Sequence, residues 1–332
     1  SWLNDDSTKN LVHGTRPNNS YSYFYSFNFD REFDGEYEPD NWKIAVNNEN
    51  FRLALTSAMD RVKALTVNEP YNPEGVLNNT VTPTAFCSAG GKDYTQYDAL
   101  KSYSDGDSFD ETKATEYRDA ARKELEAAGC TFPVKVLMPY NPSTTNWDKE
   151  CQVLEQQMEG VLGSDFIDII VEAGPETGFL SSVRRSGCYA FMKCNWGADY
   201  ADPETWTEPF TADNNYGFWD LSEDENTSAL YKEYQAKVDE ASAIYDDDEA
   251  RYTAFSEAEA ILIENAIIVP YSISSNGYEV SKLNSLEGEY APYGMTLMKY
   301  KFMSVHDTSM SMDDWNTALD TWKSEREKAI AK

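Results

Sequence analysis

The sequence predicts an α/β fold in which helices flank a mixed sheet. Helical and strand-like segments alternate between residues 110 and 173, an order typical of α/β proteins. Apolar runs such as CYAFMKCNW and AIIVPYSI indicate strands that are well covered in the core. With 332 residues, 41% of them hydrophobic, the chain is long enough for one large domain or two smaller ones.

The first 108 residues predict one strand, one helix and a long irregular segment. Alternating aromatic residues at 21–29 favour a strand. The polar segment 31–49, which contains a proline, favours a loop. Residues 49–65 then place their apolar side chains on one face of a helix. No period is sustained over residues 68–108, and an irregular stretch of that length is usually functional or wrapped on a surface.

The segment DETKATEYRDAARKELEAAG predicts a helix that Asp110 caps and Gly129 ends. Residues 131–140 follow as a strand, residues 146–163 as a helix and residues 165–173 as a second strand. This order implies a parallel βαβ unit with a right-handed crossover.

The rest of the chain adds helices, two covered strands and a polar terminal helix. The first 29 residues and the last 60 or so have no obvious pairing partner among the residues that lie between these two ends. We therefore expect part of a second lobe to be missing or built from both ends. The expected elements are a short helix at 176–187, a strand at 188–196, helices at 226–243 and 247–265, a strand at 266–273 and a helix at 312–330.

Composition argues against several classes of function. Lys and Arg total 28 against 58 Asp and Glu, and a net charge of -30 disfavours nucleic acid and anionic membranes. The five Cys include no CxxC pair and the two His are far apart, so we expect free, mostly buried thiols and no metal site. No G-x-S-x-G or H-E-x-x-H motif occurs, so we expect neither an enzyme nor a cofactor.

The stretch CNWGADYADPETW, residues 194–206, holds two notable aspartates. Asp202, followed by a proline and a glutamate, has the composition of a helix start. Asp199 directly follows an apolar strand, where an ionised carboxylate needs water or a partner. Either it faces solvent or loop amides, or it points into a cleft that receives a cation such as a ligand ammonium.

Four segments resemble one protein family. WGADYADPETW resembles the W-x-A-D-Y-x-D/E-P motif of the oligopeptide-binding branch of the extracellular solute-binding proteins of ABC importers. FRLALTSAMDR is similar to its V-R-x-A-L-x-x-A-I-D-R helix, and YSFNFD resembles the strand before that helix. YTAFSEAEAILIENAIIVPYSIS resembles the family's Y-x-x-A-E-x-I-L-x-x-x-A-P-I-I-P-L-Y stretch. The segments occur in family order and span most of the chain.

The resemblance implies one lobe of a two-lobed, periplasmic-binding-protein-like fold. Residues 1–29 would then be a strand segment of the first lobe, 30–270 the second, ligand-binding lobe, and 271–332 a return to the first. The chain would be a C-terminal fragment, with the signal and the lipid anchor upstream of Ser1. It would act outside the cell, as an anchored lipoprotein or in the periplasm, and deliver its ligand as a monomer to a membrane permease.

The resemblance also assigns ligand contacts. The acidic residue of the A-D-Y motif, Asp199 here, would pair with the α-ammonium of a peptide, and upstream cations would meet its carboxylate. The ligand-binding residues that we expect are Asp199, Trp196, Tyr200, Lys193, Arg184 and Arg185. From the residues alone, the two arginines are equally explained as solvated charges and the two aromatic residues as core. An oligosaccharide ligand remains the alternative, because 14% of the residues are aromatic and rings stack on sugars.

Overall fold

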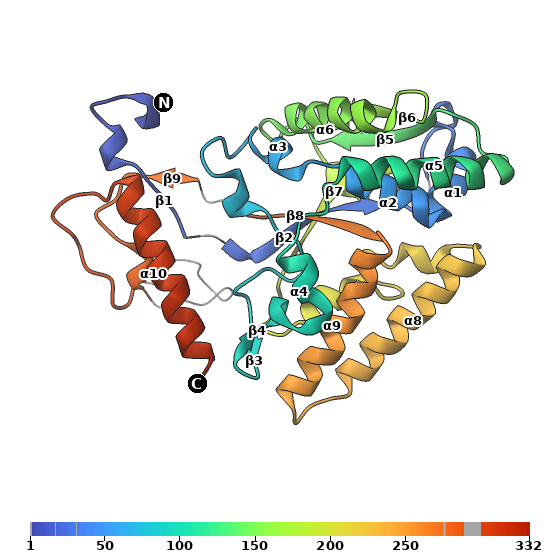
Figure 1. Cartoon of the computed structure of the whole chain (residues 1–332). Coiled ribbons are helices and arrows are strands. Elements are labelled where there is room, and N and C mark those ends of the chain that lie inside the picture. The colour runs from blue at the N-terminus through green and yellow to red at the C-terminus, as the bar shows by residue number, and fades with distance from the viewer. Residues whose placement is uncertain (1, 17, 31, 275–276, 289–299) are drawn as a thin grey trace.

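The computed structural model describes residues 2–16, 18–30, 32–274, 277–288 and 300–332. Within these residues, three antiparallel strands form the central sheet in the order β7-β2-β8. Strand β2 (Asn18–Phe27) lies between β7 (Phe191–Gly197) and β8 (Ile268–Ser274). Helices cover the sheet on both sides (Figure 1). The predicted α/β class is therefore confirmed.

The pairing of β2 corrects one expectation. The sequence indicates no strand partner for the first 29 residues, but β2 pairs with β7 from Tyr21 opposite Gly197 to Phe27 opposite Phe191. The aromatic rings of Phe27 and Phe191 lie 4.5 Å apart between centroids. Pairing across more than 160 residues leaves no local pattern in the chain, so it could not be deduced from periodicity.

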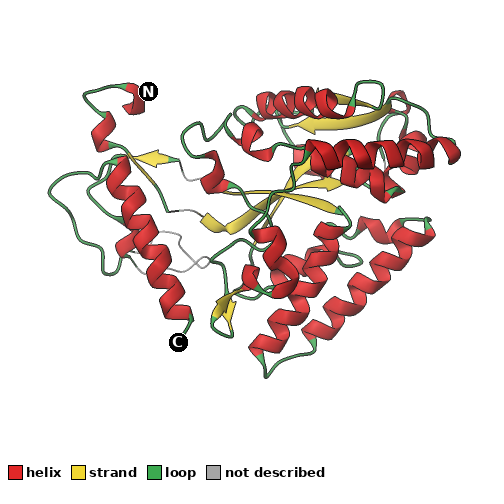
Figure 2. Cartoon of the chain, in the orientation of Figure 1, coloured by secondary structure: helices red, strands yellow, loops and turns green. Residues whose placement is uncertain are grey.

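The expected parallel unit is present. Strand β5 (Val134–Tyr140) runs parallel to β6 (Ile167–Ala173), and helix α6 (Trp147–Leu162) connects them. Helix α5 (Glu111–Ala127) precedes the unit and packs against helix α2 (Glu49–Ala58). Figure 2 shows these helices grouped on one side of the central strands.

Three segments differ from the sequence prediction. The helix expected at 49–65 is broken after α2, because the carboxylate of Asp60 accepts from the Lys63 N–H and caps a new helix, α3 (Arg61–Leu65). Helix α1 (Pro39–Asn47) replaces the loop expected at 31–49, with Pro39 at its first turn. Helix α4 (Asp98–Ser104) lies within the segment expected to be irregular.

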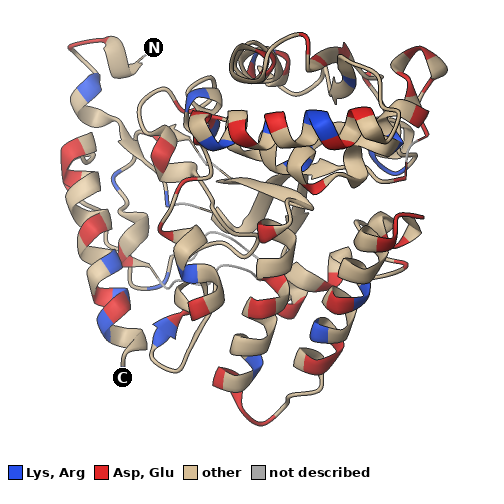
Figure 3. Ribbon diagram, turned by 45° about the vertical axis from the view of Figure 1, so that its right-hand side comes forward, with Lys and Arg blue, Asp and Glu red and all other residues tan. Residues whose placement is uncertain are grey.

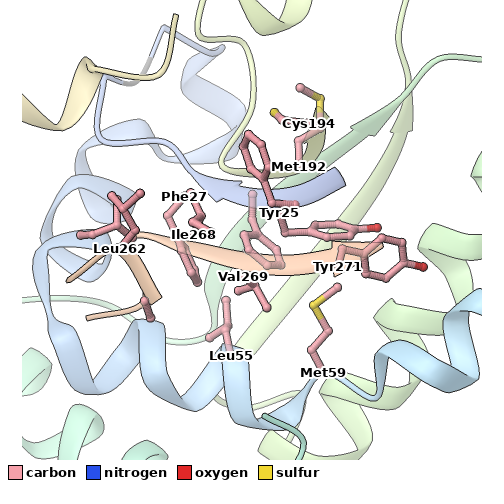
Figure 4. Packing of buried hydrophobic residues seen from close by; sticks show 14 of the residues in the cluster. Tyr25, Phe27, Leu55, Met59, Met192, Cys194, Leu262, Ile268, Val269 and Tyr271 are labelled. Atoms are coloured by element: carbon pink, nitrogen blue, oxygen red, sulfur yellow. The ribbon is translucent and has the colours of Figure 1, made fainter. Parts of the chain in front are cut away.

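The core lies around the central sheet. Figure 4 shows Tyr25 and Phe27 of β2 packed beside Val269 of β8 and above Leu55 of α2. Below the sheet in Figure 1, helices α8 (Glu225–Ser242) and α9 (Asp248–Glu264) pack against each other. All five Cys are unpaired, and only Cys188 among them is not buried.

The two ends of the chain lie side by side and form what we call the terminal layer, residues 2–16, 277–288 and 300–332. Strand β1 (His13–Gly14) pairs with β9 (Tyr278–Glu279), and helix α10 (Met312–Ile330) packs on β1 (Figure 1). The Trp315 indole stacks on the His13 ring with centroids 5.3 Å apart. Strands β3 (Ser88–Ala89) and β4 (Lys92–Asp93) form a short antiparallel hairpin, and Arg326 of α10 forms an ion pair of 2.9 Å with Asp93 of β4.

Acidic residues are spread along the helices rather than gathered in one patch (Figure 3). Among the helices in the described ranges, none is long and apolar enough to cross a membrane.

The cap of α5 gives a first testable prediction. The Asp110 carboxylate accepts from the Lys113 N–H at 3.0 Å, as the sequence predicted. Because Asp110→Ala leaves this donor without its side-chain partner, we expect it to lower the free energy of unfolding by about 1 kcal/mol. Urea unfolding measures the loss. Glu116→Ala, on the exposed face of the same helix, is the control, and an equal loss there would contradict the capping role.

Candidate functional site

A cavity of about 620 Å³ lies between the terminal layer and the rest of the molecule. Its wall combines residues from both ends of the chain with residues of the 69–85 region and the end of β8. The lining residues include Arg16, Asn19, Glu69, Tyr71, Leu77, Asn78, Thr84, Ala85, Tyr278, Trp315, Leu319, Trp322 and Arg326. Its volume is in the range of small-molecule and short-peptide sites.

The cavity wall joins aromatic rings to a few polar groups. Tyr71 and Tyr278 meet edge to face with ring centroids 5.7 Å apart. The Tyr278 hydroxyl donates to the carboxylate of Glu69 at 3.0 Å, and burial raises the pKa of Glu69. The guanidinium of Arg16 lies over the Trp322 ring, 5.2 Å from its centroid. Such a mixture of flat apolar surface and oriented polar groups suits a ligand with its own backbone donors and acceptors.

Asp199 lies just beyond the end of β7 and is exposed. Its backbone N–H donates to the Thr205 hydroxyl at 3.0 Å, but within the described part of the chain no group contacts its carboxylate by a hydrogen bond or ion pair. The preceding residue, Ala198, donates its N–H to the Ser20 carbonyl at 2.9 Å, and Ser20 adjoins the cavity residue Asn19. The carboxylate of Asp199 is therefore exposed and not held by loop amides, although Asp199 itself is not among the described residues that line the cavity.

The neighbouring Asp202 is structural. Its carboxylate accepts from the Glu204 N–H at 2.9 Å, at the start of helix α7 (Glu204–Thr207). Both of its oxygens also accept from the Arg251 guanidinium, at 2.9 and 3.0 Å. Trp206 is fully buried behind this turn. Asp202 therefore has a structural role at this turn, but the N-cap of α7 is Pro203 and not Asp202 as the sequence predicted.

Lys193 and Trp196 lie three residues apart on β7, so their side chains leave opposite faces of the strand. The Lys193 ammonium forms an ion pair with Glu150 of α6. The Trp196 indole N–H is buried and has no hydrogen-bond partner in the described residues. Tyr200 is 39% exposed and donates to Glu208 at 3.5 Å, and its partial burial and the nearby Glu204 raise its pKa.

Arg184 and Arg185 lie at the end of a π-helical turn, Leu180–Arg184, and line a separate hollow of about 330 Å³. The guanidinium of Arg184 lies over the Tyr216 ring, 5.5 Å from its centroid, and donates weakly to Asn195 at 3.5 Å. None of the six expected ligand-binding residues is among the described residues that line the larger cavity. The structure therefore does not gather the six in one pocket.

The residues that line the cavity were not predicted from the sequence, although the sequence contains part of the pattern that brings them together. Trp315, Leu319, Trp322 and Arg326 recur every three or four residues and so share one face of α10. Glu69 and Tyr71 come from the segment that has no period. No group of three His, Cys, Asp or Glu side chains that could hold a metal ion occurs within the described residues.

The family of the chain follows from comparison with known proteins. Residues 2–218 match the family described as bacterial extracellular solute-binding proteins, family 5 Middle. The match covers more than half of the chain, so the chain belongs to this family of solute-binding proteins. This confirms the resemblance found in the sequence, and it identifies a binding protein rather than an enzyme.

Curated relatives include oligopeptide-binding proteins of streptococci. AliB of Streptococcus pneumoniae is 28% identical over 350 residues, which cover 95% of this chain and 53% of AliB. SarA of Streptococcus gordonii is 25% identical, with the same shares covered. The chain thus spans about half the length of the curated relatives it matches.

Solved structures show the same fold. The peptide-bound OppA of Listeria monocytogenes superposes with a TM-score of 0.62 at 21% identity, over 91% of this chain and 52% of OppA. The substrate-binding domain of an oligopeptide ABC transporter from Bacillus anthracis gives a TM-score of 0.63 at 20% identity, over 89% of this chain and 51% of that one.

Proposed function

We propose that this chain is part of the extracellular substrate-binding component of an ABC importer and that it binds oligopeptides. The observation that carries the proposal is the exposed carboxylate of Asp199, which has no partner in the described residues and stands within the family's A-D-Y motif. A peptide α-ammonium would give it a charge-assisted hydrogen bond. The oligopeptide-binding relatives support the class of ligand.

The cavity of about 620 Å³ beside the terminal layer is the proposed ligand cleft. It lies between two parts of the chain, and in this proposal the terminal layer belongs to one lobe while residues 30–270, with strand β2, form the other. The return of residues 271–332 to the first lobe is the arrangement expected from the sequence. The chain would then be a C-terminal fragment of a two-lobed protein.

None of Asp199, Trp196 and Tyr200 lines the cavity, so in this proposal the peptide extends beyond the cavity lining and its N-terminus meets Asp199, with Trp196 and Tyr200 beside it at the end of β7. Arg184 and Arg185 line a different hollow and are left out of the proposed contacts. The bound protein would deliver its peptide, as a monomer, to the membrane permease. It would work outside the cell, as an anchored lipoprotein or in the periplasm.

The test is a calorimetric titration of the full-length protein with peptides of about three to six residues, each with a free or an acetylated N-terminus. We expect the free peptides to bind at least about tenfold more tightly, because acetylation removes the positive charge that Asp199 would pair with. Equal binding of both forms would refute the role of Asp199. Binding of oligosaccharides but of neither peptide set would refute the peptide proposal.

A further inference from the structure

The ammonium of Lys193 is already neutralised inside the protein. It lies 2.5 Å from one carboxylate oxygen of Glu150, and the side chains of Lys193 and Glu150 are only 14% and 2% exposed. The other oxygen of Glu150 accepts from the Asn68 amide at 2.9 Å. Both carboxylate oxygens of Glu150 are therefore engaged.

Aromatic rings complete the surroundings of this pair. The Lys193 ammonium lies 5.1 Å from the centroid of the Trp147 ring and 5.7 Å from that of Tyr271. Rings at these distances stabilise the cation and exclude water from it. An incoming carboxylate would have to displace Glu150 and leave its negative charge buried without a cation beside it, which is strongly unfavourable.

Two residues that contact the pair adjoin residues of the proposed cleft wall. Asn68, which holds Glu150, precedes the cavity residue Glu69. The carbonyl of Tyr271 accepts from the N–H of Asn78, another cavity residue, at 3.1 Å. Through Asn68 and Tyr271, the pair is therefore connected to the lining of the proposed cleft.

We propose that Glu150 is an internal substitute for a ligand carboxylate and thereby sets specificity. This rests on the proposed function. The ligands are then oligopeptides held by their N-terminus and backbone, whose C-terminus can be amidated or extended without loss of affinity. Lys193 is a structural cation in this chain, not a subsite for the peptide's C-terminal carboxylate.

A double-mutant cycle in the ligand-free protein tests the pair itself. We expect Lys193→Met and Glu150→Gln each to lower the melting temperature, because each leaves a buried group without its partner, and the double variant to melt above at least one of the single variants. The exposed pair of Lys237 and Glu257, treated in the same way, is the matched control, with changes close to zero. Additive losses at Lys193 and Glu150 would overturn the coupling.

The specificity is tested on the full-length protein with one peptide in free-acid and C-terminally amidated forms, both with free N-termini. We expect dissociation constants within about twofold of each other. The Glu150→Ala substitution removes the carboxylate beside Lys193. In this variant we expect the free-acid peptide to bind about five- to tenfold more tightly than the amidated peptide. A tenfold preference for the free acid in the unmodified protein, lost in Lys193→Met, would overturn this inference alone. Failure of both peptides to bind would overturn the proposed function as well.

Discussion

The Asp199→Asn variant of the full-length protein is expected to bind peptides with a free N-terminus about 10- to 100-fold more weakly than the unmodified protein. The substitution keeps the shape of the side chain but replaces a charged acceptor by a neutral one. A hydrogen bond between two charged groups contributes about 1.5–3 kcal/mol, which corresponds to one to two decades in the dissociation constant. Isothermal calorimetry at fixed ionic strength measures the change.

Two controls separate the proposed contact from a general effect of charge. Asp246→Asn removes the same charge at an exposed position between α8 and α9, and should leave affinity unchanged within about twofold. An N-acetylated peptide should bind Asp199→Asn and the unmodified protein equally, because it has no ammonium to lose. If Asp199→Asn kept full affinity for free peptides, Asp199 would be a solvated loop carboxylate.

Much of the fold could be predicted because its signals are local. Asp110 and Gly129 bracket α5 within twenty residues, and the βαβ unit follows from one strand, one helix and one strand in sequence. Prediction failed where two local signals conflict. The helical spacing of apolar residues in 49–65 continues across Asp60, but the Asp60 side chain caps a new helix at that point, and the first helix ends before it.

The candidate site, like the fold, could be predicted only in part. Asp199 was found because a short motif surrounds it, and its exposure agrees with an available carboxylate. The cavity was not predicted, because lining residues such as Glu69 and Trp315 are about 250 residues apart in the chain and line the same cavity only in the folded protein. The partner of Lys193 was missed as well, since Glu150 is 43 residues away on another element.

The second large effect is expected at Glu259, a fully buried carboxylate on α9. One of its oxygens accepts from the N–H groups of Val81 and Thr82, at 2.7 and 2.9 Å, and the other from the Thr82 hydroxyl at 2.6 Å. It thereby fixes a loop whose neighbouring residues, Asn78 and Thr84, line the proposed cleft.

We expect Glu259→Ala to lower the free energy of unfolding by on the order of 4 kcal/mol. The substitution leaves three buried donors without an acceptor, each costing about 1–3 kcal/mol when unsatisfied. Urea unfolding followed by tryptophan fluorescence measures the loss. Glu264→Gln, an exposed substitution on the same helix, should change stability by less than about 0.5 kcal/mol. A similarly small change in Glu259→Ala would show that the loop is held by other contacts.

The pH dependence of the same site has a definite sign. Burial raises the pKa of Glu259 above its ordinary value of 4.5, although the hydrogen bonds from Thr82 and Val81 oppose this. The folded protein therefore binds this proton more tightly than the unfolded chain does. Its contribution to stability is full below pH 4.5 and is lost as the pH rises through the folded-state pKa. Glu259→Gln cannot titrate, so its stability relative to the unmodified protein should rise with pH across that window. If the difference in stability between the two proteins stayed constant over this pH range, the hydrogen bonds from Val81 and Thr82 would cancel the effect of burial on the pKa of Glu259.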